Sequence, residues 1–390
     1  MSDLSLPLQQ ATSQLPVSSY FDEALLQREL EHIFQRGPRY VGHVNSVPNV
    51  GDYYALPHEG EGRALVRTAQ GVKLVSNVCR HRQAVMLKGR GNLQQSGSGH
   101  ASGHIVCPLH RWTYDGGGRV GQPGQPEQRL GQLLGAPHFA HDPCLNLQRY
   151  PLREWNGLLF EDNGRDIGAD LAGLEQISEL NFEGMVLGHV ELHQCNYNWK
   201  TFIEVYLEDY HVEPYHPGLG HFVTCDDLRW TFKPEYSVQT VGVQNLQQGG
   251  GSPVYQHWHE VLLRYRNGQL PERGAVWLTY YPHLMIEWYP HVLTVSTVHP
   301  LGVNQTLNRV EFYYPEDIAA FEPEFMAAQR AAYMETCIED DEIGERMDAG
   351  RKALLARGEN EVGPYQSPME DGMQHFHEWY RSRMGAHVQG

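Results

Sequence analysis

The sequence has little cysteine and no long hydrophobic run. Only six of its 390 residues are cysteine, and the four outside the motif described below lack disulfide-scaffold spacing, which indicates a reducing compartment. No stretch reaches the roughly 20 apolar residues of a transmembrane helix, and the N-terminus lacks a basic segment followed by an apolar one. We therefore expect a cytoplasmic protein that does not span a membrane. These four cysteines are Cys144, Cys195, Cys225 and Cys337.

Positive charge is also scarce. Lys and Arg number 30 against 47 Asp and Glu, so the formal net charge is −17 at pH 7. Such a chain should repel nucleic acids and anionic membranes, and it should weakly favour a cationic substrate or a basic protein partner. A dinucleotide-binding fingerprint is missing, because the glycine runs at 116–118 and 249–251 are not followed by a helical pattern. An enzyme of this sequence that drew electrons from NAD(P)H would need a separate reductase.

The sequence does contain a dense group of metal-binding residue types within residues 77–115. Cys79 and His81 form a Cys-x-His pair, and Cys107 and His110 form a Cys-x-x-His pair. Two thiolates and two imidazoles suit either a structural zinc ion or a [2Fe–2S] cluster with both histidines on one iron. Small zinc modules usually open with two cysteines two to four residues apart, whereas each loop here offers one Cys and one His. The spacing favours the cluster and leaves zinc as the alternative.

This region, CRH…CPLHRWTYD, resembles the Rieske proteins. The resemblance implies a [2Fe–2S] cluster in which Cys79 and Cys107 bind one iron and His81 and His110 bind the other.

The first loop is longer than in most Rieske proteins. Its extra residues, 94–104, are rich in Gly and Ser and include His100 and His104. The composition is that of a surface excursion, and a Rieske iron already has its two imidazoles. We therefore expect both histidines to lie outside the ligand set.

A second candidate metal site lies in the sequence EDYHVEPYH. His211 and His216 are five residues apart, which places them about 140° apart around a regular helix. Pro214 should end the helix at Glu213 and allow His216 to turn back toward His211. Two imidazoles and one carboxylate on one face of an iron leave three positions for water, O2 and substrate, as in non-heme Fe(II) oxygenases. Two surface or hydrogen-bonded histidines without a metal remain the alternative.

The run NWKTFIEVYLEDYHVEPYHPGL is similar to the iron-binding segment of Rieske non-heme iron oxygenase α subunits. The resemblance covers nearly the whole chain. It implies that His211 and His216 bind mononuclear Fe(II) and that Glu208 is the acidic residue three before the first histidine. The third ligand of that family is an Asp on a C-terminal helix. The segment ETCIEDDEIGERMDAG matches that helix and selects Asp340, with Asp341 as the adjacent alternative.

The expected fold class is α+β. Apolar periodicity predicts helices over residues 21–36, 316–357 and 373–384, and strand-like runs fill residues 228–315. The resemblance implies a small all-β Rieske domain and a helix-grip-like catalytic domain, in which an antiparallel sheet is flanked by helices. The expected division is an N-terminal helical segment packing with the catalytic domain (1–40), the Rieske [2Fe–2S] domain (41–165) and the catalytic non-heme iron domain (166–390).

The resemblance also implies an activity and partners. The chain is expected to be the terminal mono- or dioxygenase of a multicomponent system that uses O2 and electrons from a separate flavin or iron–sulfur NAD(P)H reductase, or from a ferredoxin. Family members assemble as head-to-tail trimers. In such a trimer Glu208 would accept hydrogen bonds from His211 of its own subunit and from His110 of its neighbour.

The resemblance implies a small organic substrate, and a small aromatic compound is the first expectation. The alternative is a monooxygenase or demethylase of a quaternary ammonium compound of the carnitine, choline or betaine type, with Trp258, Tyr281 or Trp288 caging the cation. A second alternative is an electron-transfer Rieske protein without catalytic iron. The length of the chain and the histidine–carboxylate set argue against that alternative.

Overall fold

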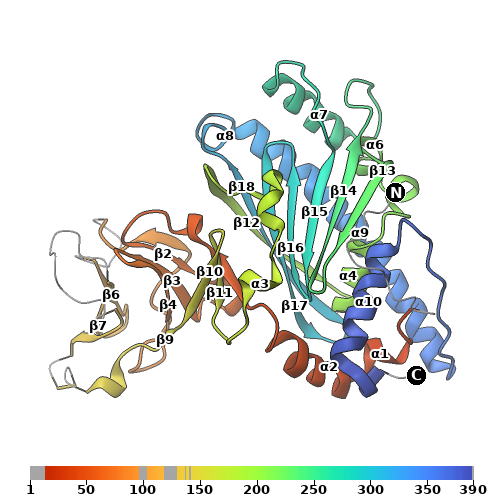
Figure 1. The fold of residues 1–390 in the computed structure, drawn as a ribbon. Coiled ribbons are helices and arrows are strands. Elements are labelled where there is room, and N and C mark those ends of the chain that lie inside the picture. The colour runs from red at the N-terminus through yellow and green to blue at the C-terminus, as the bar shows by residue number, and fades with distance from the viewer. Residues whose placement is uncertain (1–13, 96–102, 118–129, 137, 140–141, 389–390) are drawn as a thin grey trace. The chain divides into compact units, whose positions relative to one another are not determined.

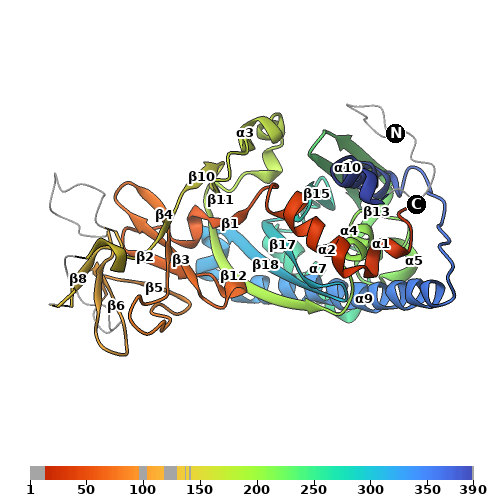
Figure 2. The same ribbon diagram turned by 90° about the horizontal axis from the view of Figure 1, so that it is seen from below.

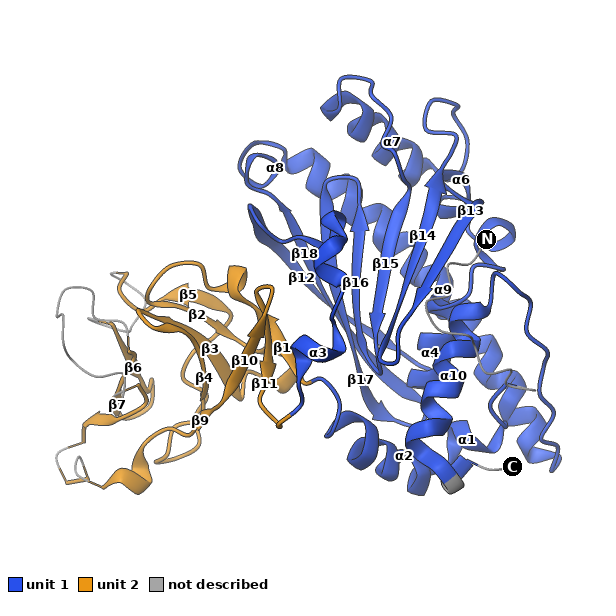
Figure 3. Ribbon diagram, viewed as in Figure 1, with its two compact units in different colours: residues 1–38, 165–390 blue, residues 39–164 orange. Residues whose placement is uncertain are grey.

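The structure, a computed structural model, describes residues 14–95, 103–117, 130–136, 138–139 and 142–388. The chain divides into two compact units (Figures 1 and 3). The large unit comprises Met1–Pro38 and Arg165–Gly390, and the small unit comprises Arg39–Gly164. His100 of the first-loop insertion lies outside the described residues, whereas His104 lies within a strand.

The small unit is all-β among its described residues. A five-stranded antiparallel sheet has the order β5–β2–β3–β4–β9, and two three-stranded sheets have the orders β1–β11–β10 and β6–β7–β8. The strands are β1 (Tyr40–His43), β2 (Asp52–Ala55), β3 (Arg63–Thr68), β4 (Gly71–Ser76), β5 (Arg90–Asn92), β6 (His104–Val106), β7 (Thr113–Asp115), β8 (Leu133–Gly135), β9 (Arg149–Tyr150), β10 (Leu152–Trp155) and β11 (Leu158–Glu161).

The core of the small unit includes the two motif cysteines. Aliphatic side chains of β3 and β4, such as Val66 and Val75, pack in one cluster with Cys79, Cys107 and Tyr114. Both cysteines are buried. Although they come from loops, their sulfur atoms therefore lie in the interior of the unit.

The large unit is built on a seven-stranded antiparallel sheet with the order β12–β18–β17–β16–β15–β14–β13. All the side chains of β15 are buried, because helices and the N-terminal segment cover the sheet (Figures 1 and 2). The strands are β12 (Met185–Cys195), β13 (Val223–Phe232), β14 (Tyr236–Val243), β15 (Ala275–Tyr280), β16 (Leu284–Tyr289), β17 (Val292–Gly302) and β18 (Gln305–Pro315).

The longest helix of the described residues is α9, with 34 residues. It packs with α4 and α7 and sends side chains toward the sheet. The helices are α1 (Ser18–Phe21), α2 (Glu23–Glu29), α3 (Ile167–Asp170), α4 (Trp199–Tyr206), α5 (Val212–Tyr215), α6 (Leu219–Phe222), α7 (Pro253–Tyr265), α8 (Glu316–Phe321), α9 (Pro323–Ala356) and α10 (Asp371–Met384). A π-helical turn, Leu30–Phe34, extends α2.

Buried ion pairs fix α4, the helix that precedes the two histidines. Glu29 of α2 is fully buried, and its carboxylate lies 2.7 Å from Lys200 Nζ and accepts a hydrogen bond from Trp199 Nε1 at 2.8 Å. Burial raises the pKa of Glu204, but Arg351 and His377 outweigh this effect and hold it at about 2. These contacts connect α4 with the N-terminal segment, α9 and α10, so the start of the histidine segment is rigidly placed.

The fold class expected from the sequence is confirmed: a small all-β unit accompanies a large unit of antiparallel sheet and helices. One element was not expected. Residues 228–315 were expected to contain strand-like runs, and they also include the helix α7. Its start has a recognisable sequence signal, because the Ser252 side chain caps the helix by accepting from the Tyr255 amide and Pro253 occupies the first turn. Within the described residues, no helix is long and apolar enough to cross a membrane.

Candidate metal centres and pocket

Two loops of the small unit hold the Cys/His motif and share one backbone construction. The amides of Cys79 and Cys107 each donate to the carbonyl five residues later, at 2.9 and 2.8 Å. The amides of Gln83 and Arg111, four residues after each cysteine, donate back to the cysteine carbonyls at 3.1 Å. Gln83 and Arg111 both have positive φ, 54° and 60°. Non-glycine residues seldom adopt this conformation, and such strain gathers at functional sites.

The two motif histidines lie side by side. The rings of His81 and His110 are 4.7 Å apart, and His81 stacks on Trp112 at 4.8 Å with an interplanar angle of 8°. His81 Nδ1 is buried and has no hydrogen-bond partner within the described ranges. Burial raises the pKa of the Cys107 thiol, although the amides of Leu109 and His110 act against it. A buried imidazole nitrogen without a partner is what a metal ligand looks like without its metal.

The four motif residues fit a binuclear cluster better than one zinc ion. A tetrahedral zinc ion would require all four ligand atoms to converge on one point. In the part of the chain that the structure describes, only two sets of three such atoms lie within 4.8 Å of one another, and both are in the large unit. The chemistry of the donors, two interior sulfurs and two imidazoles nearer the surface, fits a [2Fe–2S] cluster with its irons bound differently.

The histidine segment of the large unit folds differently from the expectation. Pro214 was expected to end the helix, but α4 already ends at Tyr206, and Pro214 lies inside the short helix α5. His211 and His216 are the residues immediately before and after α5. One helical turn therefore separates them and brings their rings to 4.9 Å.

Asp340 of α9 completes a set of three. Its Oδ1 lies 3.1 Å from His216 Nε2 and 3.4 Å from His211 Nε2, yet it has no hydrogen bond of normal geometry in the described residues. Burial lowers the pKa of His211, but Asp340 and Glu208 raise it to about 10. The two imidazole nitrogens and the carboxylate oxygen lie within 4.8 Å of one another. They could hold a cation between them, and two imidazoles with one carboxylate fit Fe(II).

Two further carboxylates orient the histidines. Glu208 Oε1 lies 2.6 Å from His211 Nδ1, and Glu339 Oε2 lies 2.7 Å from His216 Nδ1. A carboxylate on one ring nitrogen fixes the tautomer and turns the other nitrogen toward the metal. Glu208 was expected from the sequence. Glu339 was not singled out from the sequence, and no local signal distinguishes its role.

The adjacent acidic residues Glu339, Asp340 and Asp341 of α9 make different contacts, because successive side chains of a helix point about 100° apart. Asp340 faces the two histidines, whereas Asp341 lies 2.8 Å from His193 Nε2 and accepts a hydrogen bond from Tyr197 OH at 3.1 Å. With Cys195, His193 and Asp341 form the second tight set of metal-binding side chains among the described residues. Asp341 therefore does not join the first set.

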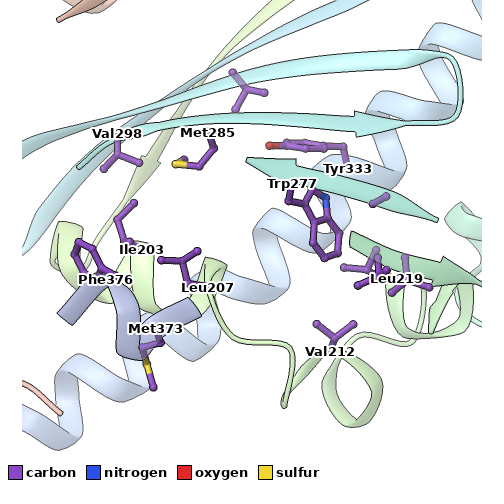
Figure 4. Close-up of a cluster of buried hydrophobic side chains, with 14 of the residues drawn as sticks. Ile203, Leu207, Val212, Leu219, Trp277, Met285, Val298, Tyr333, Met373 and Phe376 are labelled. Carbon is purple, nitrogen blue, oxygen red and sulfur yellow. The ribbon is translucent and has the colours of Figure 1, made fainter. Parts of the chain in front are cut away.

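A cavity of about 790 Å³, including its opening, reaches the His211–His216–Asp340 set. Two more buried carboxylates, those of Asp209 and Glu287, line it, and none of its lining residues is Lys or Arg. Its walls are otherwise largely aromatic and aliphatic. In the close-up of the surrounding core, Trp277 of β15 and Tyr333 of α9 lie on the same side, with Val212 and Leu219 below them (Figure 4).

The aromatic side chains at this cavity are not those expected to cage a cation. Trp258 packs edge-on against Phe325 at 4.8 Å, and Tyr281 is enclosed by the aromatic side chains of α10. Neither these two residues nor Trp288 lines the cavity. The aromatic walls are formed instead by residues including Tyr206, Trp277, Tyr289 and Tyr333. Alternation along the strands could have indicated that Trp277 and Tyr289 share one face of the sheet. Which face lines a cavity depends on how the helices pack, and the sequence does not show this.

Two family models match the chain. The model described as "Ring hydroxylating alpha subunit (catalytic domain)" matches residues 182–386, and the model described as "Rieske [2Fe-2S] domain" matches residues 38–146.

Named relatives match over nearly the full length. Putrescine 2-hydroxylase of Ralstonia nicotianae is 62% identical over 98% of this chain and 100% of its own length. Putrescine 2-hydroxylase of Bordetella bronchiseptica is 61% identical over 96% of this chain and 85% of its own length. Among solved structures, a quaternary ammonium Rieske monooxygenase in complex with L-carnitine aligns with a TM-score of 0.70 at 18% identity, covering 95% of each chain. At that identity the structural similarity supports the fold alone.

Proposed function

Because the chain belongs to the family of Rieske oxygenase α subunits, we propose that it hydroxylates a short aliphatic diamine, putrescine or a close analogue. Membership of this family brings two cofactors, a Rieske [2Fe–2S] cluster and a mononuclear iron. The observation that carries the proposal is the cavity beside the two-histidine, one-carboxylate set. It has two further buried carboxylates and no Lys or Arg in its lining, which suits a substrate with two positive charges. The names of the two relatives above 60% identity agree with it.

The first expected substrate class and one alternative function do not hold. An aromatic substrate is not supported, because the two relatives above 60% identity are named for putrescine, which has no ring. An electron-transfer Rieske protein without catalytic iron is excluded by the match of the catalytic-domain model to residues 182–386. Quaternary ammonium substrates are named for more distant relatives, such as the carnitine monooxygenase oxygenase subunit of Escherichia coli at 25% identity. No feature of the cavity favours such a substrate over a diamine.

The ligands are assigned as follows within this proposal. The cluster is bound by Cys79, His81, Cys107 and His110, and the mononuclear iron by His211, His216 and Asp340.

The net reaction is R–H + O2 + 2e⁻ + 2H⁺ → R–OH + H2O. When bound, the mononuclear iron supplies O2 activation and the cluster supplies electrons one at a time. The chain's own residues hold the geometry: Glu208 and Glu339 keep both imidazole Nε2 atoms turned toward Asp340. The largely apolar walls exclude water from the reacting C–H bond, and the buried carboxylates hold the ammonium groups. The electrons come from a separate NAD(P)H reductase or a ferredoxin.

The proposed assembly is a homotrimer in which the cluster of one subunit serves the iron of the next. Two inactive variants test it together, Cys107→Ser, which lacks the cluster, and Asp340→Ala, which lacks the mononuclear iron. Random mixing in equal amounts should restore about a quarter of wild-type activity, because half of the clusters and half of the irons are intact at each interface. Verified mixed trimers without activity would exclude electron transfer between subunits.

The substrate proposal is tested with purified protein that contains both cofactors, a surrogate reductase, NADH and O2. We expect putrescine to give a product one oxygen atom heavier, in proportion to the NADH consumed. Carnitine, choline and naphthalene serve as comparison substrates. If a quaternary ammonium compound or naphthalene gave product and no diamine did, the diamine proposal would be wrong.

A further inference from the structure

Glu287 is one of two buried carboxylates that line the cavity, with Asp209, and neither forms an ion pair with Lys or Arg in the described residues. Four glutamates are buried in the described residues. Glu29 lies 2.7 Å from Lys200, and Glu204 lies 2.6 Å from Arg351. The fourth, Glu311, has an arginine nitrogen at 3.9 Å. Glu287 is 2% exposed, and no Lys or Arg in the described ranges lies within ion-pair distance of it.

The partners of Glu287 are hydroxyl groups. Its Oε1 accepts a hydrogen bond from Tyr333 OH at 2.7 Å, and its Oε2 accepts one from Tyr289 OH at 3.2 Å. Burial raises the pKa of Glu287 to about 7, because neutral donors only partly replace the lost hydration. A buried carboxylate of this kind is costly to the fold unless a cation joins it.

The surroundings of Glu287 suit an organic ammonium group. Trp277 lies directly across from it on β15, and the rings of Trp277 and Tyr289 are 6.1 Å apart. The rings of Tyr289 and Tyr333 are 6.2 Å apart and perpendicular. Aromatic faces attract a cation through their quadrupole, and a carboxylate forms charge-assisted hydrogen bonds with it.

The distance between Glu287 and the His211–His216–Asp340 set suits a short diamine. Tyr333, which contacts Glu287, and Asp340 are seven residues apart on α9, about 10 Å along the helix axis at ~1.5 Å per residue. Thr336 and Cys337 line the cavity between them. A four-carbon diamine with a hydrogen bond at its far end can bridge this separation while a carbon atom near its other end faces the metal.

We infer that Glu287 is the specificity-determining residue of the cavity: its carboxylate binds the ammonium group of the diamine that is farther from the hydroxylated carbon. This inference rests on the proposed function and deepens it. The other ammonium group is common to diamines and monoamines, so Glu287 is the residue that distinguishes between them.

The test compares putrescine with 4-amino-1-butanol, in which a neutral hydroxyl group replaces one ammonium. Wild-type protein should prefer putrescine by about 100-fold in kcat/KM, the scale of a buried charge pair. Glu287→Gln should lose most of this preference, chiefly through a higher KM for putrescine, and its kcat/KM for 4-amino-1-butanol should change by less than about 3-fold. Calorimetric titration of putrescine into the oxygen-free protein should show the same loss in affinity.

Two control variants separate charge from structure. Tyr333→Phe removes a hydrogen bond from Glu287 but keeps the carboxylate, so the preference for putrescine should remain above about 10-fold. Glu311→Gln removes a buried carboxylate of the same sheet that does not line the cavity, so its preference should equal that of wild type. The cluster spectrum and thermal melting verify the fold of each variant.

The outcomes are distinct. If wild-type protein hydroxylates putrescine and Glu287→Gln keeps the preference, the inference is wrong and the proposed function stands. A fall in preference as large in Tyr333→Phe as in Glu287→Gln would also overturn it, because the role would then be structural. Wild-type protein that hydroxylates no diamine would overturn the proposed function and the inference together.

Discussion

The two candidate metal centres differ in how far apart along the chain their residues lie. In the small unit all four side chains come from residues 79–110, in two loops that repeat the same pair of backbone hydrogen bonds. In the large unit two histidines flank one helical turn, and their carboxylate comes from α9, more than 120 residues later. Local backbone geometry shapes the first centre, whereas the packing of a long helix shapes the second. The second centre should therefore be more sensitive to changes of register.

The largest effect is expected from a comparison of alanine substitutions at two adjacent residues of α9, Asp340 and Asp341. Asp340→Ala should lower the iron content from about three atoms per chain to about two and reduce turnover to background, because the cluster keeps its two irons. Asp341→Ala should keep three irons, because Asp341 contacts His193 and Tyr197 instead. Metal analysis and the visible spectrum measure both. If Asp341→Ala lost the mononuclear iron and Asp340→Ala retained it, the register of α9 would be misassigned.

The reciprocal change in the small unit should also abolish turnover, but with the opposite metal signature. Cys107→Ser should lose acid-labile sulfide and the visible absorption of the cluster, because a hydroxyl group binds iron more weakly than a thiolate. The mononuclear iron should remain. Cys144→Ser is the matched control, because Cys144 is exposed and lies outside the core cluster that contains Cys107. Loss of both metals in Cys107→Ser would mean that the two centres are not independent.

The difference between the two candidate metal centres also explains which of their residues the sequence could predict. Cys79, His81, Cys107 and His110 follow a short motif, so the sequence places them without knowledge of the fold. The sequence also brings Asp340 to the two histidines, but only through resemblance, and it leaves Asp341 open. Glu339 and Glu287 could not be predicted, and strand alternation alone does not show which aromatic side chains form the cavity walls. These roles depend on which face of α9 and of the sheet meets the cavity. Trp258 and Tyr281 were misjudged for the same reason.

A smaller effect separates the two carboxylates that contact His211 and His216. Glu208 and Glu339 each lie within 2.7 Å of a histidine Nδ1. Substitution of either by Gln should orient that histidine less well and lower the turnover rate by roughly 10-fold. Only Glu208 is proposed to reach the neighbouring subunit as well. Glu208→Gln should therefore retain both metals but turn over about 100-fold more slowly, with slow reoxidation of the cluster in single-turnover measurements. Equal defects in the two variants would remove the case for a bridge through Glu208.

The smallest expected effect is on stability, and it again distinguishes the two units. The described part of the small unit buries no Asp or Glu, whereas the large unit buries Glu287 without a basic partner. The pKa of Glu287 is raised from 4.5 to about 7 by burial, so the folded state binds a proton more tightly than the unfolded chain does. The stability from this proton is present below pH 4.5 and is lost as the pH rises through 7, by about 3 kcal/mol in total.

Glu287→Gln keeps the shape of the protonated side chain and cannot ionise. At pH 8 it should therefore melt about 5 °C above wild type, and at pH 4.5 the two melting temperatures should coincide. Putrescine at pH 8 should raise the melting temperature of wild type and close the gap, because its ammonium group supplies the missing positive charge to the ionised carboxylate. It should leave Glu287→Gln nearly unchanged. A gap that is the same at both pH values would show that folding does not shift the pKa of Glu287. The ionised carboxylate would then cost the fold nothing, and the buried charge that putrescine is expected to neutralise would be absent.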